Sequence, residues 1–170
     1  QHCPGHIFSD MPSTDYWSHG AIDYVVAHKL FFGTSATTFE PMTKLSRAMI
    51  VKVLYTLEGE PAVTGENPFR DVADNRWYTN AVIWAAENKI VAGIGDGKFD
   101  PDGDATREQV ATILYEYAAF KGCDMNVYGD LSTFTDMGEV SNFAKEPMTW
   151  AVAESLISGV AVGREALLDP

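Results

Sequence analysis

The segment between residues 94 and 109, IGDGKFDPDGDATREQ, carries carboxylates at a spacing that could hold a calcium ion. A twelve-residue calcium loop needs oxygen ligands at positions 1, 3 and 5, glycine at position 6 and glutamate at position 12. Counting from Asp100 puts aspartates at positions 3 and 5, but Ala105 and Ala111 occupy the glycine and glutamate positions. No phosphate-binding G-x-x-x-x-G-K-[ST] pattern fits either, so a solvated turn is the favoured interpretation.

His2, Cys3 and His6 also place metal-binding side chains close together. Structural zinc sites usually combine two ligand pairs at matching spacings, and the sequence offers no second pair. Terminal residues without a metal are therefore the favoured interpretation, and neither a metal site nor another cofactor is predicted. Cys3 and Cys123 could pair in an oxidising compartment, but two cysteines are too few to define a disulfide framework, so their pairing stays open.

No set of residues in this chain clearly predicts catalytic chemistry. The four histidines and two cysteines form no nucleophile–base pattern, and there is no G-x-S-x-G motif. With 24 Asp and Glu residues, some carboxylate pair will lie at a glycosidase-like separation by chance. We therefore expect that this chain is not an enzyme.

The overall charge narrows the classes of partner. The 170 residues carry a formal charge of −12, which argues against nucleic acid and against anionic membrane surfaces, since both bind basic faces. No apolar run approaches the roughly 20 residues of a membrane span, so membrane insertion is not expected. Because the chain begins with Gln1 rather than Met, either a removed signal peptide or a trimmed sequence is expected.

A repeat organises the chain, as a shift of 60 residues shows. The matched pairs include Trp17 with Trp77, Leu30 with Ile90, Gly33 with Gly93, Phe39 with Phe99, Ser46 with Thr106, Arg47 with Arg107 and Leu54 with Leu114. A third copy begins at Phe134-Thr135-Asp136 and runs to Pro170, where the sequence stops before the Thr-Arg segment. Repeats of this length indicate supersecondary units whose neighbours must pack together to close a core.

Each copy is predicted to fold as helix, loop, helix. The first helix follows the tryptophan and is expected to end at a glycine, Gly33 or Gly93. The second begins at Ser46 or Thr106 and carries an i, i+3, i+4, i+7 apolar stripe. Thr106 with Gln109 forms a capping box, which Ser46 lacks, so the second copy is expected to have the better fixed helix start.

The repeated unit F-x-D, Trp, A-[IV], Gly, F-x-P and Thr/Ser-Arg resembles the S-layer homology repeat of bacterial surface proteins, from Phe8 to Pro170. The resemblance implies an all-α fold of tandem helix-loop-helix repeats, packed as a pseudo-threefold spindle around a central helical bundle. The repeats would span 8–60, 69–121 and 134–170, the third without its second helix, and together form one compact domain.

The same resemblance implies a secreted protein at the cell wall, within the surface layer. Such repeats anchor proteins non-covalently by holding a secondary cell-wall polysaccharide, often with a pyruvylated sugar, in grooves between lobes. The residues that this implies for polysaccharide binding are Arg47, Arg107, Trp17, Trp77, Asp10, Asp71, Gly93 and Gly95. Met49 and Gln109 replace the family glutamate, and Phe143 stands where the third tryptophan should be.

Each implied role has a structural alternative. Arg47 and Arg107 fall in the first turn of a helix, where an arginine fork could grip a carboxylate, but they could equally pair with one of the many acids. The tryptophans are expected to be partly buried. The aspartates of the F-x-D units, including Asp136, are better explained by helix capping than by ligand contact. The glycines could allow close approach of a ligand or serve a turn with positive φ.

A second function is compatible with the same features. The chain could be a self-assembly module of a surface layer without glycan binding, in which another segment or a second copy completes the third repeat as a homo-oligomer. The acidic composition and the packing of repeats suit this role as well as the first.

Overall fold

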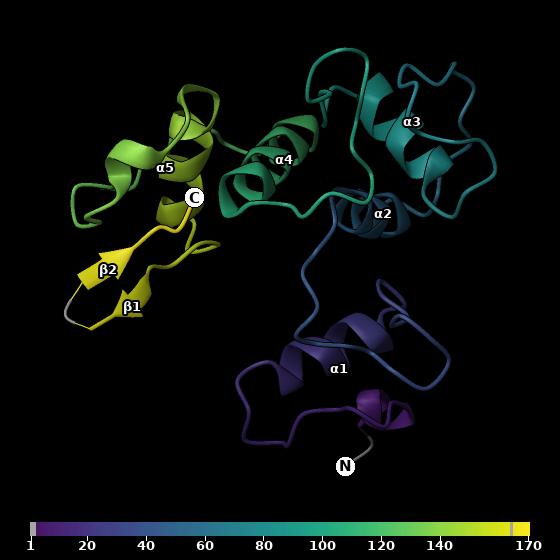
Figure 1. The fold of residues 1–170 in the computed structure, drawn as a ribbon, viewed down its shortest axis with the longest axis horizontal. Helices are drawn as coiled ribbons and strands as arrows, with labels where there is room; N and C mark the ends of the chain where they lie inside the picture. The colour runs from purple at the N-terminus through teal and green to yellow at the C-terminus, as the bar shows by residue number, and fades with distance from the viewer. Residues whose placement is uncertain (1–2, 164) are drawn as a thin grey trace.

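A computed structural model describes residues 3–163 and 165–170 and confirms the all-α class (Figure 1). The elements in chain order are η1 (Pro4–Ile7), α1 (His19–Ala27), α2 (Arg47–Leu57), α3 (Thr79–Glu87), α4 (Arg107–Phe120), η2 (Met137–Glu139), η3 (Asn142–Ala144), α5 (Lys145–Ala153), β1 (Val160–Val162) and β2 (Glu165–Leu167). The two short strands form an antiparallel hairpin with Ala161 opposite Ala166. Within the described residues, no helix is long and apolar enough to cross a bilayer.

The second helices begin where the sequence predicts. The side chains of Ser46 and Thr106 accept hydrogen bonds from the N–H groups of Met49 and Gln109, each at 3.3 Å. The predicted return bond from Gln109 is not formed, because its Oε1 atom has no hydrogen-bond partner in the described part of the chain. The two helix starts are therefore capped alike, and the predicted advantage of the second copy is wrong.

The first helices end on left-handed residues that are not glycine. Lys29, Lys89 and Ser155 have φ values of 56°, 59° and 59°, and the N–H groups around them bond back to carbonyls of the last helical turn. Gly33 and Gly93 lie four residues further on, so the prediction that they end these helices is wrong. Both positions are crowded, because a Cβ on either glycine would lie 2.5 Å from a backbone carbonyl oxygen, and Gly33 in addition has a φ of 76°.

Helices from neighbouring copies share each core. α2 of the first copy packs against α3 of the second, and α4 of the second packs against α5 of the third. Small side chains make close contact possible at both interfaces, since Ala48, Ala85, Ala111 and Ala151 are fully buried. The second helix of one repeat therefore finds its partner in the first helix of the next.

The α1 helix differs from its counterparts α3 and α5. In the described residues its main contact is with η1, and it packs extensively against no other helix. Figure 1 shows α1 and the N-terminal segment as a separate lobe, away from α5 and the β-hairpin. Phe8 and Ile22 fill a small core of this lobe. A pseudo-threefold spindle would need a third helix pair at α1, so that arrangement stays a prediction.

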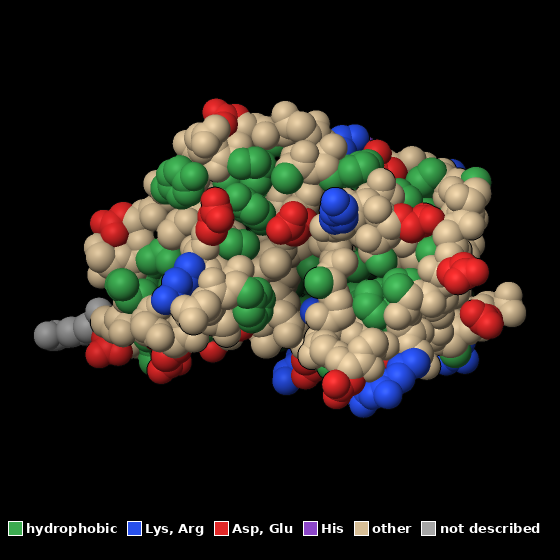
Figure 2. All heavy atoms as spheres, turned by 90° about the horizontal axis from the view of Figure 1, so that it is seen from above, with side chains coloured by type: hydrophobic (Ala, Val, Ile, Leu, Met, Phe, Trp, Pro, Cys, Tyr) green, Lys and Arg blue, Asp and Glu red, His purple; other side chains and the backbone are tan. Residues whose placement is uncertain are grey.

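Hydrophobic and charged side chains are interspersed on the surface. On the face shown in Figure 2, acidic side chains stand singly among exposed hydrophobic ones, and basic side chains are scattered between them. The large exposed hydrophobic residues include Trp17, Phe32 and Met42. No field of one charge sign dominates this face.

Candidate functional site

The aspartates of the three F-x-D units bind backbone rather than cap helices. Each accepts two hydrogen bonds from consecutive N–H groups that lie 28 to 33 residues later. The pairs are Asp10 with Phe39 and Glu40 at 2.8 and 2.6 Å, Asp71 with Phe99 and Asp100 at 2.8 Å each, and Asp136 with Leu168 and Asp169 at 2.7 and 2.8 Å. Helix capping is therefore the wrong explanation, and both oxygens of each carboxylate serve to hold a loop.

These hydrogen bonds stabilise the ionised carboxylates. The N–H groups of Phe39 and Glu40 hold the pKa of Asp10 below its ordinary value. Burial raises the pKa of Asp71 and Asp136, but the two backbone hydrogen bonds to each outweigh it and leave both pKa values lowered. A depressed folded-state pKa contributes stability that is present above the unfolded pKa and is lost as pH falls through the folded value.

We expect the free energy of unfolding to fall as pH drops below about 4, the unfolded pKa of aspartate. The measurement is urea unfolding between about pH 7 and about pH 3. Asp71→Asn should cost about 1 kcal/mol at neutral pH, because the amide oxygen is a weaker acceptor and its NH₂ opposes the second N–H. The variant should also lose part of the acid sensitivity; an identical pH profile in both proteins would contradict this role.

The two arginines at the helix starts also bind backbone of the next copy. Arg47, which is 6% exposed, donates through Nε to the Phe99 carbonyl at 2.8 Å and through Nη2 to the Ala92 carbonyl at 3.2 Å. Its guanidinium carbon lies 4.7 Å from the centre of the Phe99 ring. Burial lowers the pKa of Arg47, although Asp100 and Asp71 act in the opposite direction.

Arg107 repeats this arrangement one copy later. Its Nε donates to the Leu168 carbonyl at 2.7 Å and its Nη2 to the Ser158 carbonyl at 2.6 Å. Neither arginine forms an ion pair within the described residues, so pairing with an acid is the wrong alternative for both. Each arginine instead ties the start of a second helix to the loop after the next first helix.

Two equivalent grooves lie at corresponding positions of the repeat. The first groove, of about 430 Å³, is lined by residues 30–34, one face of α2 and Trp77. The second groove, of about 880 Å³, is lined by residues 90–94, the same face of α4 and Phe143. Every residue of the first groove has its counterpart in the second. The correspondences include Gly33 with Gly93, Met49 with Gln109 and Trp77 with Phe143.

The second groove contains the more varied polar groups. Arg47 forms part of its wall, with Nη1 uncommitted in the described chain. The buried Oε1 atom of Gln109 has no partner there, although Gln109 lines the groove. Phe143 presents an aromatic side chain that is 58% exposed. The groove therefore has an apolar platform at Phe143 and a buried cation at Arg47, and the Gln109 side chain lies in its wall with Oε1 enclosed.

The other residues implied by the resemblance are distributed unevenly. Trp77 is half exposed and lines the first groove, whereas Trp17 is 82% exposed and lines neither. Gly95 has φ 107° in a tight turn, and Gly93 has no positive φ. Arg107 lines neither groove.

The second-groove residues that sequence reasoning missed include the polar residues Lys89, Thr112 and Glu116. Thr112 and Glu116 lie three and seven residues after Gln109, so helical spacing was the signal that could have identified them. Burial, followed by the charge of Glu146, raises the pKa of Glu116 and favours its neutral form.

Residues 7–48 and 68–111 match the family model of the S-layer homology domain. The chain is 28% identical over 162 residues to the surface-layer 125 kDa protein of Lysinibacillus sphaericus, covering 95% of this chain and 13% of that protein. It is 30% identical over 168 residues to the S-layer protein sap of Bacillus anthracis, with 98% and 19% covered. An endoglucanase of Bacillus sp. (strain KSM-635) is 29% identical over 152 residues, with 89% and 16% covered. The chain thus spans less than a fifth of each relative.

Proposed function

This chain belongs to the S-layer homology domain family, and from that premise we propose that it holds a cell-wall polysaccharide in the second groove. The family and the surface-layer relatives indicate a secreted protein that is associated with the cell wall at the cell surface. Anchoring to the wall is the role of such domains. Our proposal concerns the glycan that is bound and the groove that binds it.

The meeting of Arg47, Gln109 and Phe143 in one groove supports the proposal most directly. A sugar ring can stack on the exposed Phe143 side chain, and rotation of the Gln109 side chain would bring its amide, whose Oε1 has no partner in the described residues, to a sugar hydroxyl. A carboxylate carried by the sugar, such as a pyruvyl group, can accept from Nη1 of Arg47. The net charge of −12 repels an anionic glycan, but this repulsion is screened beyond about 8–10 Å at physiological salt.

The second groove can be tested without disturbing Arg47, which also supports the fold. Phe143→Ala and Gln109→Ala should each weaken binding to purified wall polysaccharide about tenfold, because an aromatic contact or a hydrogen bond of about 1.4 kcal/mol is lost. Calorimetric titration of the polysaccharide gives the affinity. Mild removal of its pyruvyl groups should weaken binding to the wild-type chain in the same assay.

Trp77→Ala is the matched control, since it removes the equivalent aromatic side chain of the first groove. It should leave affinity within about twofold of the wild-type value if the second groove holds the ligand. A loss confined to Trp77→Ala would move the site to the first groove. Unchanged affinity in all three variants would exclude both grooves.

A self-assembly role is the second candidate, and the unpaired α1 helix favours it. α1 exposes Tyr24 and lacks the helix partner that α3 and α5 have in the described residues. A second copy covering α1 would give an oligomer whose mass rises with concentration, which sedimentation equilibrium measures. We do not propose catalysis for this chain, because the region that it matches makes up only 16% of the endoglucanase.

A further inference from the structure

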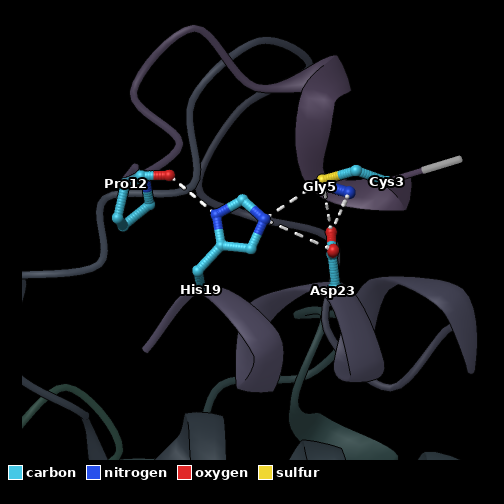
Figure 3. Close-up of polar contacts among 5 residues, drawn as sticks. All are labelled: Cys3, Gly5, Pro12, His19 and Asp23. Carbon is cyan, nitrogen blue, oxygen red and sulfur yellow. Dashed lines mark hydrogen bonds and ion pairs between the residues drawn. The ribbon is translucent and has the colours of Figure 1, made fainter. Parts of the chain in front are cut away.

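The fold brings two pairs of metal-binding side chains together at the N-terminal lobe. Cys3 directly precedes the short η1 helix and His6 lies within it, and His19 and Asp23 lie one turn apart on α1. Figure 3 shows Cys3, His19 and Asp23 pointing toward one another. Ligand atoms of Cys3, His6 and His19 all lie within 4.8 Å of one another.

The hydrogen bonds around His19 fix which of its nitrogens carries a proton. Nδ1 lies 2.8 Å from the Pro12 carbonyl, which can only accept, so Nδ1 is the donor (Figure 3). In the neutral ring, Nε2 then carries a lone pair directed at the cluster. A backbone carbonyl that orients a ligating histidine in this way is the usual second partner at metal sites.

The cluster has more acceptors than protons. The Cys3 thiol donates its proton to Oδ1 of Asp23 at 2.9 Å, and the Gly5 N–H donates to the same oxygen at 2.8 Å. The other carboxylate oxygen, Oδ2, lies 3.5 Å from Nε2 of His19. With Nδ1 protonated and the ring neutral, the Nε2 lone pair and Oδ2 of Asp23 face each other, so a cation placed between them would have two ligand atoms already oriented toward it.

We propose that Cys3, His6, His19 and Asp23 bind one zinc-class divalent cation, which fixes the N-terminal segment on α1. Sulfur, two imidazole nitrogens and one carboxylate oxygen suit Zn²⁺ and disfavour Ca²⁺ and Mg²⁺, which prefer oxygen. Tetrahedral zinc with bonds of about 2.3 Å to sulfur and about 2.0 Å to nitrogen separates those atoms by about 3.5 Å. The Cys3 Sγ to His19 Nε2 distance is 3.4 Å, and the thiol proton leaves to solvent on binding.

The second ligand pair was hidden in the sequence, because His19-x-x-x-Asp23 includes a carboxylate and lies far from Cys3 in the chain. His2, which stands beside Cys3 and close to His6 in the sequence, lies outside the described residues. A disulfide role for Cys3 fits less well, since both cysteines are free thiols.

Cobalt titration of the chelator-treated chain tests the site, because Co²⁺ bound to a thiolate absorbs in the near ultraviolet. We expect one Co²⁺ per chain with a thiolate charge-transfer band and tetrahedral visible bands, displaced by one equivalent of Zn²⁺. Cys3→Ser should abolish the thiolate band and weaken Zn²⁺ binding at least about tenfold. The serine hydroxyl can still donate to Asp23, so this variant keeps the hydrogen bond of the lobe.

Matched controls distinguish metal binding at this site from weak cation binding by the 24 Asp and Glu residues, which provide no sulfur ligand. Cys123→Ser removes the other thiol and His28→Gln an exposed histidine of the same lobe, and both should keep the band and the affinity. Absence of a thiolate band in the wild-type chain would overturn the proposal. A band that survives Cys3→Ser, or one lost in Cys123→Ser, would do the same. These readouts do not depend on glycan binding.

Discussion

Arg47→Ala is expected to lower the free energy of unfolding by about 3 kcal/mol, a large part of the stability of a small domain. The guanidinium is 6% exposed and supplies the donors for the carbonyls of Phe99 and Ala92. Each carbonyl left without a donor costs about 1 kcal/mol or more, and the contact with the Phe99 ring adds about 1 kcal/mol. Urea unfolding followed by circular dichroism gives the value.

Arg107→Ala is the matched comparison, since it removes the same pair of bonds one copy later. Its bond to Ser158 is exposed, so water can replace the lost donor, and the expected cost is about 1 kcal/mol. Arg47→Lys should lie between the two alanine variants, because lysine keeps the charge but loses the planar fork. If Arg47→Ala and Arg107→Ala lowered the free energy of unfolding equally, burial of Arg47 would not explain its contribution to stability.

The helix starts could be predicted from the sequence because their signals are local. Ser46 and Thr106 cap helices through an N–H three residues away, and the apolar stripes follow within the same segment. The choice of helix partner could not be predicted, since the first and second helices of the two complete copies both carry apolar faces. The packing of α2 on α3 is decided by tertiary contacts.

The partners of the repeated polar residues were hidden for a different reason. Asp71 and Arg47 both bind backbone groups of the loop that contains Phe99, and backbone groups leave no mark in a sequence. Recurrence of an arginine therefore predicts a shared role without saying whether its partner is a ligand, an acid or a carbonyl. Two groove positions carried more information, because Gln109 and Phe143 stood out as departures from the family pattern.

Gly93→Ala is also expected to cost about 3 kcal/mol, although Gly93 has an ordinary φ. A Cβ there would lie 2.5 Å from the Lys98 carbonyl oxygen and 3.0 Å from Cε1 of Phe69. The carbonyl cannot easily move aside, because it accepts the Ile94 N–H at 2.8 Å to close the turn. The corresponding positions Gly33 and Gly159 show the same crowding against a phenylalanine ring.

Gly20→Ala distinguishes crowding from the general effect of adding a methyl group. Gly20 lies in α1, and a Cβ added there would have no neighbouring atom within 4 Å, so alanine should stabilise by about 0.5 to 1 kcal/mol. If Gly93→Ala were tolerated as well as Gly20→Ala, residues 93–98 would have to shift as a unit. Gly93 forms part of the second groove, so such a shift would reshape that groove and should appear as altered polysaccharide affinity in the Gly93→Ala chain.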